Sequence, residues 1–154
     1  MPRFTPPDPD FEMKVRDSFA RQTFMRTVGA ILAEVSPGRC EVALPWREDL
    51  CQQHGYIHGG VTTALADTAA GYAAYTLMPA ASSVLATEFK INLMAPARGE
   101  RLVARAEVLK PGRTLSVVRT EVYAENEGTE TCIAAMLSTL ICLRGTPDAP
   151  ARSG

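Results

Sequence analysis

The chain has 154 residues, of which 46% are hydrophobic, and this is enough to build the core of one domain. Sixteen lysines and arginines against seventeen aspartates and glutamates give a net charge of −1, and neither sign forms a block, which argues against a nucleic-acid or membrane-surface partner. The first ten residues contain four prolines and two aspartates where a secretory signal needs an apolar core, so we expect a cytoplasmic protein.

The N-terminal region predicts a short helix. Residues 1–8 are expected to form a flexible arm, and Asp8 followed by Pro9 is a typical start for a helix over residues 9–20. One apolar stripe on this helix is formed by residues that recur every fourth position: Phe11, Val15 and Phe19. We expect the helix to lie on the body of the domain as a lid or brace.

The remainder predicts one long helix and six strands. Residues 28–35 and 39–45 flank the turn signal SPGR and predict a hairpin. The alanine-rich run 60–77 is too long for a strand and predicts a helix. Four β-rich segments with short connections follow, at 84–94, 101–110, 114–126 and 129–143. We therefore predict a single α+β domain over residues 9–144, with an antiparallel sheet that buries the long helix and a flexible tail at 145–154.

Asp67 is the only permanently charged side chain between Asp49 and Glu88, and it is embedded among alanine, threonine and small apolar residues. A charge at this position argues against a membrane span. Burial of an unpaired carboxylate is unfavourable, so Asp67 is either satisfied by a nearby hydroxyl, such as that of Thr63 or Tyr72, or used in chemistry.

Two glycines, Gly59 and Gly60, open the predicted helix, where backbone N–H groups lack an intrahelical acceptor. Such groups can stabilise a carbonyl oxygen that acquires negative charge, and with a carboxylate they suit hydrolysis of an activated acyl group. Gly59 and Asp67 are about 12 Å apart along one helix, too far to act on one carbonyl. Two antiparallel helices related by a two-fold axis would bring them together, so we expect a homodimer.

The segment 84–94 shows strand alternation. The residues that share one face are Leu85, Thr87, Phe89, Ile91 and Leu93. Thr87 is then the one hydroxyl on the face expected to meet the helix. It either serves the reaction or is present because threonine favours strands.

The segments GYIHGGVTTALADTAAGYAA and TEFKINLMAPARGERLVARAEVLKPGRT resemble the PaaI-type branch of the hotdog-fold acyl-CoA thioesterases. The similarity covers about residues 28–143. H-G-G alone is a weak signal, but the combination is specific: a glycine stands three residues before the histidine, an aspartate nine after it, and an E-F-x-I-N-x-x-x-P-A strand follows. The resemblance implies a long helix wrapped by an antiparallel sheet, and a homodimer with two interfacial active sites that often pairs into a dimer of dimers.

The resemblance also implies roles for five residues. The N–H of Gly59 polarises the thioester carbonyl, and Asp67 of the facing subunit acts as general base or nucleophile. His58 supports the loop and the thioester end of the ligand. Thr87 stands where the family often has a serine that holds the attacking water, and Gln52 stands where many members have asparagine.

Substrate contacts are expected from basic and apolar side chains and from Gly60, which lets a ligand approach the backbone. The candidates for the phosphates of coenzyme A are Lys90, Arg98 and Arg113. The candidates for the walls of an acyl slot are Phe24, Met25, Leu77 and Met78. Each of these residues is equally compatible with ordinary surface or core positions.

We expect an acyl-CoA thioester hydrolase that acts on an aryl- or medium-chain acyl-CoA without a cofactor. His54 and His58 are four apart, but the glycines around them oppose a helical metal pair, so no metal site is expected. Two alternatives remain: a non-catalytic acyl-CoA-binding module, and a dehydratase acting on a hydroxyacyl thioester.

Overall fold

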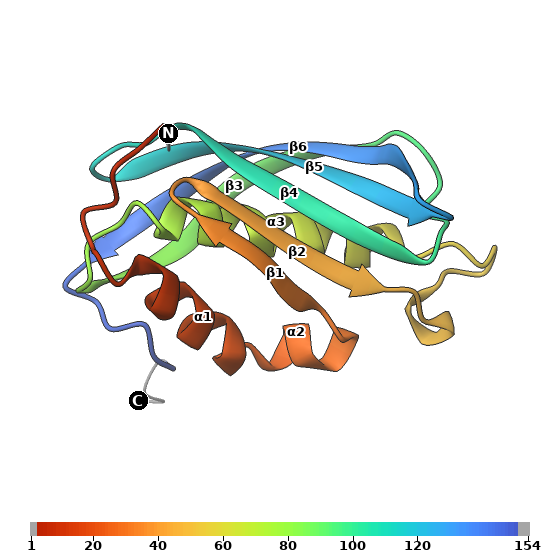
Figure 1. The fold of residues 1–154 in the computed structure, drawn as a ribbon, viewed down its shortest axis with the longest axis horizontal. Helices are drawn as coiled ribbons and strands as arrows, with labels where there is room; N and C mark the ends of the chain where they lie inside the picture. The colour runs from red at the N-terminus through yellow and green to blue at the C-terminus, as the bar shows by residue number, and fades with distance from the viewer. Residues whose placement is uncertain (1–2, 151–154) are drawn as a thin grey trace.

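Six antiparallel strands form one curved sheet around a long helix in the computed structural model, which describes residues 3–150 (Figure 1). The order of the strands across the sheet is β1-β2-β4-β5-β6-β3. Their bounds are β1 Ile31–Ser36, β2 Arg39–Pro45, β3 Ser82–Leu93, β4 Arg101–Lys110, β5 Leu115–Asn126 and β6 Thr129–Arg144. The ends of the predicted arm and tail, residues 1–2 and 151–154, lie outside the described residues.

The long helix α3, Gly59–Tyr75, packs against the concave face of the sheet, and the predicted α+β hotdog fold is confirmed. Most of the α3 residues that are buried against the strands are alanines. Small side chains let the helix backbone approach the sheet closely, which explains why the sequence of α3 has no simple apolar stripe.

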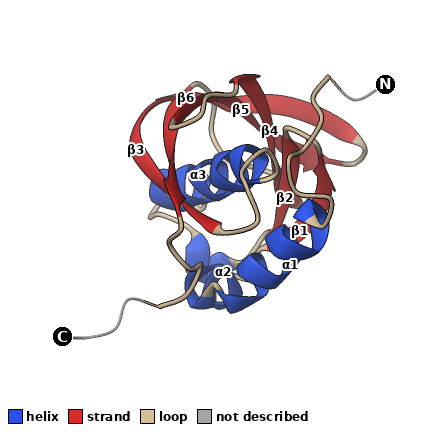
Figure 2. Cartoon of the chain, turned by 90° about the vertical axis from the view of Figure 1, so that its left-hand side faces the viewer, coloured by secondary structure: helices blue, strands red, loops and turns tan. Residues whose placement is uncertain are grey.

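Two further helices cover the open side of the sheet, α1 at Phe11–Arg21 and α2 at Thr23–Val28 (Figure 2). Helix α2 was not predicted, and Val28 ends it instead of beginning the first strand. Gly29 caps α2 with a φ of 81°, a conformation that glycine adopts easily. A 3₁₀ turn at Glu48–Leu50 completes the helical elements of the described range.

Helix α1 begins two residues later than predicted because Asp8 organises the preceding turn instead of the helix itself. The Asp8 carboxylate accepts from the backbone N–H of Asp10 at 3.0 Å and pairs with Lys14 Nζ at 3.1 Å. Lys14 also donates to the carbonyl of Met78 at 2.8 Å, just beyond the end of α3. This buried arrangement fixes the start of α1 against the end of α3, and Phe4 of the preceding segment packs against the core.

Strand β3 is an edge strand, and a bulge interrupts its alternation. The pairing with β6 shifts between Ala86 and Glu88, so Thr87 is the extra residue. Val84 and Ile91 both pack against the core, although an uninterrupted strand would place them on opposite faces. The predicted single face through residues 85–93 is therefore wrong.

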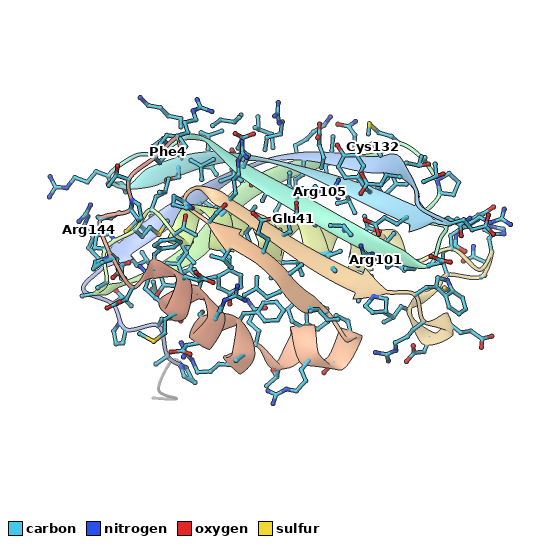
Figure 3. All side chains as sticks on the ribbon, viewed as in Figure 1. Phe4, Glu41, Arg101, Arg105, Cys132 and Arg144 are labelled. Atoms are coloured by element: carbon cyan, nitrogen blue, oxygen red, sulfur yellow. The ribbon has the colours of Figure 1, made fainter. Side chains whose placement is uncertain are left out.

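The outer face of the sheet carries ion pairs rather than an apolar surface. Arg105 on β4 donates to Glu41 on β2 at 3.1 Å, and Figure 3 shows the two side chains together on that face. Arg101 pairs with Glu125 on the neighbouring β5. These pairs are partly exposed to solvent, which screens them, so each contributes modestly to stability. Within residues 3–150, no helix combines the length and apolar character that a bilayer span requires.

Candidate active site

A cavity of about 460 Å³ lies between the α1–α2 junction, the middle of α3 and the first half of β3. Asp67 lines it from α3. Met25 from α2 and Val84 from β3 supply apolar surface, whereas Gln22 and Tyr72 supply polar groups. A carboxylate in a mixed pocket of this kind can meet a substrate that has one reactive polar bond and an apolar body.

The Asp67 side chain is partly buried, and its Oδ1 atom is inaccessible to water and has no hydrogen-bond partner among residues 3–150. Burial raises the pKa of this carboxyl above its ordinary value of 3.8, because the charged form loses solvation. A carboxylate with a raised pKa is a stronger base than a solvated one, and Asp67 presents this base to the cavity that it lines.

Neither of the two hydroxyl groups considered as partners, those of Thr63 and Tyr72, donates a hydrogen bond to the Asp67 carboxylate. Thr63 Oγ1 donates to the carbonyl of Gly59 at 2.8 Å. The Tyr72 hydroxyl accepts from Gln22 Nε2 at 2.9 Å and lies 3.1 Å from the hydroxyl oxygen of a buried serine on α1. The interpretation of Asp67 as a core aspartate held by Thr63 or Tyr72 is therefore wrong.

The N-terminus of α3 presents one free N–H group, not two. His58 is the N-cap, and its Nδ1 atom accepts from the N–H of Gly60 at 2.8 Å. The N–H of Gly60 thus lacks an intrahelical acceptor, as predicted, but the His58 side chain occupies it. No acceptor is found for the N–H of Gly59 within the described range, so this group can receive a developing oxyanion. Because Nδ1 accepts, the neutral His58 ring carries its proton on Nε2.

Replacement of His58 by alanine should lower the free energy of unfolding by about 1 kcal/mol, because Gly60 loses its capping acceptor. Asparagine at this position can accept the same bond and should recover most of the loss. Thermal unfolding of the three proteins measures the difference. The His58 side chain is exposed, so an equal loss in both variants would contradict the capping role.

Gly59 and Asp67 lie near opposite ends of β3. A Cβ atom on Gly59 would approach Leu93 Cδ1, at the end of the strand, to 2.7 Å. The cavity of Asp67 is lined instead by the first half of β3, at Val84, Leu85 and Ala86. One chain thus carries a free N–H and a free carboxylate that are about 12 Å apart along α3.

Residues 54–131, half of the chain, match the family model described as the thioesterase superfamily. The chain belongs to this superfamily. The structure of a thioesterase family protein from Silicibacter pomeroyi is 49% identical and superposes with a TM-score of 0.86, over 88% of this chain and 99% of that one. Acyl-coenzyme A thioesterase 13 of Pongo abelii is 33% identical over 115 residues, which cover 73% of this chain and 80% of the relative.

The PaaI protein of the E. coli phenylacetic acid degradation operon has the same fold, with a TM-score of 0.79 over 89% of this chain and 96% of that one. Its sequence is 20% identical.

Two polar residues expected at the reaction centre, Gln52 and Thr87, each make a hydrogen bond within this chain. The side-chain carbonyl of Gln52 accepts from the N–H of His54 and stabilises its own loop. The hydroxyl of Thr87, at the bulge, donates to the carbonyl of Thr139 at 3.0 Å. Neither residue lines the Asp67 cavity.

Some of the predicted ligand contacts line the Asp67 cavity, and others do not. Phe24 and Met25 line the Asp67 cavity. Met78 is buried in the core, and neither it nor Leu77 lines the cavity. The basic candidates are on exposed surface: Lys90, which donates to Asn92, together with Arg98 and Arg113.

Three features of the cavity were not predicted from the sequence. They are the hydrogen-bonded cluster of Ser18, Tyr72 and Gln22, the ion pair of Arg21 and Asp148, and the part of the cavity lined by Gly71. The first two join residues that are far apart in the chain, and no local pattern predicts such pairings. Gly71 did give a signal, because a glycine inside an alanine-rich helix lowers helix stability.

Proposed function

We propose that the chain hydrolyses the thioester of an aryl- or medium-chain acyl-CoA to the free acid and coenzyme A. The observation that carries this proposal is the state of Asp67: a carboxylate in a cavity, with a raised pKa and an Oδ1 atom that no residue in the described range binds. Membership of the thioesterase superfamily and the similarity to an acyl-CoA thioesterase support the same reaction.

In the proposed mechanism, the N–H of Gly59 donates to the thioester carbonyl oxygen and stabilises the negative charge that develops on it. Asp67 follows one of two routes. As general base, it takes a proton from water while the water oxygen bonds to the carbonyl carbon. As nucleophile, it forms a mixed anhydride that water then cleaves. In both routes the carbon–sulfur bond breaks, and the thiolate of coenzyme A leaves and is protonated.

The two groups are brought together by a second copy of the chain. Within residues 3–150, strand β3 has a neighbour on one side only, and its exposed apolar side chains include Leu85, Phe89 and Leu93. Antiparallel pairing of two β3 edges would place the start of one strand beside the end of the other. The Asp67 cavity of one subunit would then face Gly59 of its partner. Two such homodimers can pair further into the dimer of dimers that the sequence resemblance implies.

The experiment that tests the proposal is a thiol-release screen over aryl- and straight-chain acyl-CoAs, with each product identified by mass spectrometry. We expect equal amounts of free acid and coenzyme A from at least one substrate. Stabilisation by acyl-CoA without thiol release would instead identify a binding module. An enoyl product from a hydroxyacyl-CoA would identify a dehydratase. The dehydratase is disfavoured because Nδ1 of His58 is already engaged as the cap of α3.

A further inference from the structure

Gly71 is a helix-interior glycine for which the packing of the chain gives no reason. It lies within α3, four residues before the end of the helix, where glycine is less favourable than alanine. A Cβ atom built on Gly71 would meet no atom within 4 Å in the described structure. At Gly59 and Gly60, by contrast, a Cβ atom would crowd Leu93 and His58. The space beside Gly71 is therefore not required by the fold.

This space belongs to the cavity of Asp67. Gly71 follows Asp67 by four residues, which places it on the same face of α3 and about 6 Å further along the axis. Both residues line the cavity, and Met25 and Val84 line it from the other elements. A group bound at Asp67 and extending along α3 would pass directly over the Cα atom of Gly71.

We propose that the acyl group of the substrate lies against Gly71, and that the missing side chain there admits a ring or a branch about one helical turn from the thioester carbon. Gly71 is then a specificity-determining residue of the chain. This inference rests on the proposed thioesterase function and narrows its substrate class from aryl- or medium-chain to ring-bearing or branched acyl groups.

The far end of the cavity supports a compact acyl group. Tyr72 follows Gly71 directly, and its buried hydroxyl is held by Gln22 and Ser18. Arg21 and Asp148 form an ion pair of 2.6 Å that also lines the cavity. These hydrogen-bonded groups end the apolar part of the slot beyond Gly71. A long flexible chain would have to displace them, whereas a ring would not.

The test compares Gly71→Ala and Gly71→Leu with the unmodified protein on phenylacetyl-CoA and propionyl-CoA. Gly71→Ala should raise Tm by about 3 °C, because alanine is the better helix former. Gly71→Ala should lower kcat/KM for phenylacetyl-CoA by about tenfold, and Gly71→Leu should lower it further. The kcat/KM for propionyl-CoA should be nearly the same in all three proteins. The control is Ala20→Gly, an exposed position on α1 outside the cavity. Ala20→Gly should lower Tm but leave the ratio of kcat/KM for phenylacetyl-CoA to kcat/KM for propionyl-CoA unchanged.

Binding of thioether analogues of both substrates, measured by calorimetry, separates this inference from the proposed function. If the unmodified protein hydrolyses no acyl-CoA, the proposed function fails, and calorimetry still reports whether Gly71→Leu selectively weakens the ring-bearing analogue. Equal affinities for this analogue in all three proteins would overturn the role of Gly71. Sedimentation supplies a second check: dissociation of an oligomer by Gly71→Leu would assign the space to a second copy of the chain and would also overturn it.

Discussion

Replacement of Asp67 by asparagine is expected to lower kcat for thioester hydrolysis by about a thousandfold, because the amide can neither accept the proton of water nor attack the carbonyl. Steady-state thiol release measures this loss. Asp49→Asn is the matched control. Asp49 is exposed, and its hydrogen bond with Arg47 holds the pKa of that carboxyl below its ordinary value. Full turnover in Asp67→Asn would remove Asp67 from the mechanism.

The same substitution should make the protein more stable at neutral pH. Burial raises the pKa of Asp67, so the folded protein binds this proton more tightly than the unfolded chain does. The stability that this proton contributes is complete below 3.8, the ordinary value, and is lost as the pH rises through the raised folded pKa. Asparagine does not ionise, so the variant does not lose this stability as the pH rises. Tm of Asp67→Asn should therefore exceed that of the unmodified protein at pH 7, and the two should converge in acid.

The pH profile of turnover should follow from the same pKa. Hydrolysis requires the ionised carboxylate, so kcat should fall as the pH drops through the raised pKa of Asp67. The midpoint of this acidic limb should lie above 3.8, the value for a solvated aspartate.

Gly59→Pro should lower kcat/KM by about a hundredfold or more, because proline has no N–H to donate to the oxyanion. The backbone accommodates the change. Gly59 is the first residue of α3, where proline is well tolerated, and His58 before it has φ −59° and ψ 136°, which suit a residue that precedes proline. Gly59→Ala is the matched control, since both substitutions place a Cβ atom near Leu93 but alanine keeps the N–H. Equal activities of the two variants would show that this N–H does not act.

Mixing the two inactive proteins tests whether a site is shared between subunits. If each reaction centre takes Gly59 from one chain and Asp67 from its partner, a mixed dimer of Gly59→Pro and Asp67→Asn has one intact centre. Random exchange of subunits should then restore about a quarter of the unmodified activity. No recovery after exchange, verified by native mass spectrometry, would place both groups of each centre on one chain.

The sequence predicted the fold well where the pattern is long, and less well where a single residue interrupts it. Helix α3 consists mainly of residues that favour helices, and the four strands after it consist mainly of residues that favour strands. The observed bounds of these elements differ from the predicted ones by two residues or fewer. Helix α2 has six residues, too few to establish a helical period. The bulge at Thr87 depends on pairing with β6, which no local pattern shows.

Part of the candidate site was predictable from chemistry. A lone carboxylate in an apolar helix is costly in any fold, so Asp67 stands out without a structure. The free N–H at Gly59 and the engaged one at Gly60 could not be separated in the sequence, because the difference depends on the direction of the His58 ring. The partner of Gln52 depends on the fold of its own loop, and the partner of Thr87 depends on the pairing of β3 with β6, so neither could be predicted from the sequence.

Helix α3 also has a consequence for how the chain can vary. The carboxylate and the first glycine belong to one uninterrupted helix, Gly59–Tyr75, so the residues between them act as a spacer of fixed length. Insertion of a single residue there would turn Asp67 by about 100° around the helix axis and out of its cavity. Relatives that share this chemistry should therefore differ in this spacer by exchange of residues, and gaps in their alignments should fall in the connections between strands.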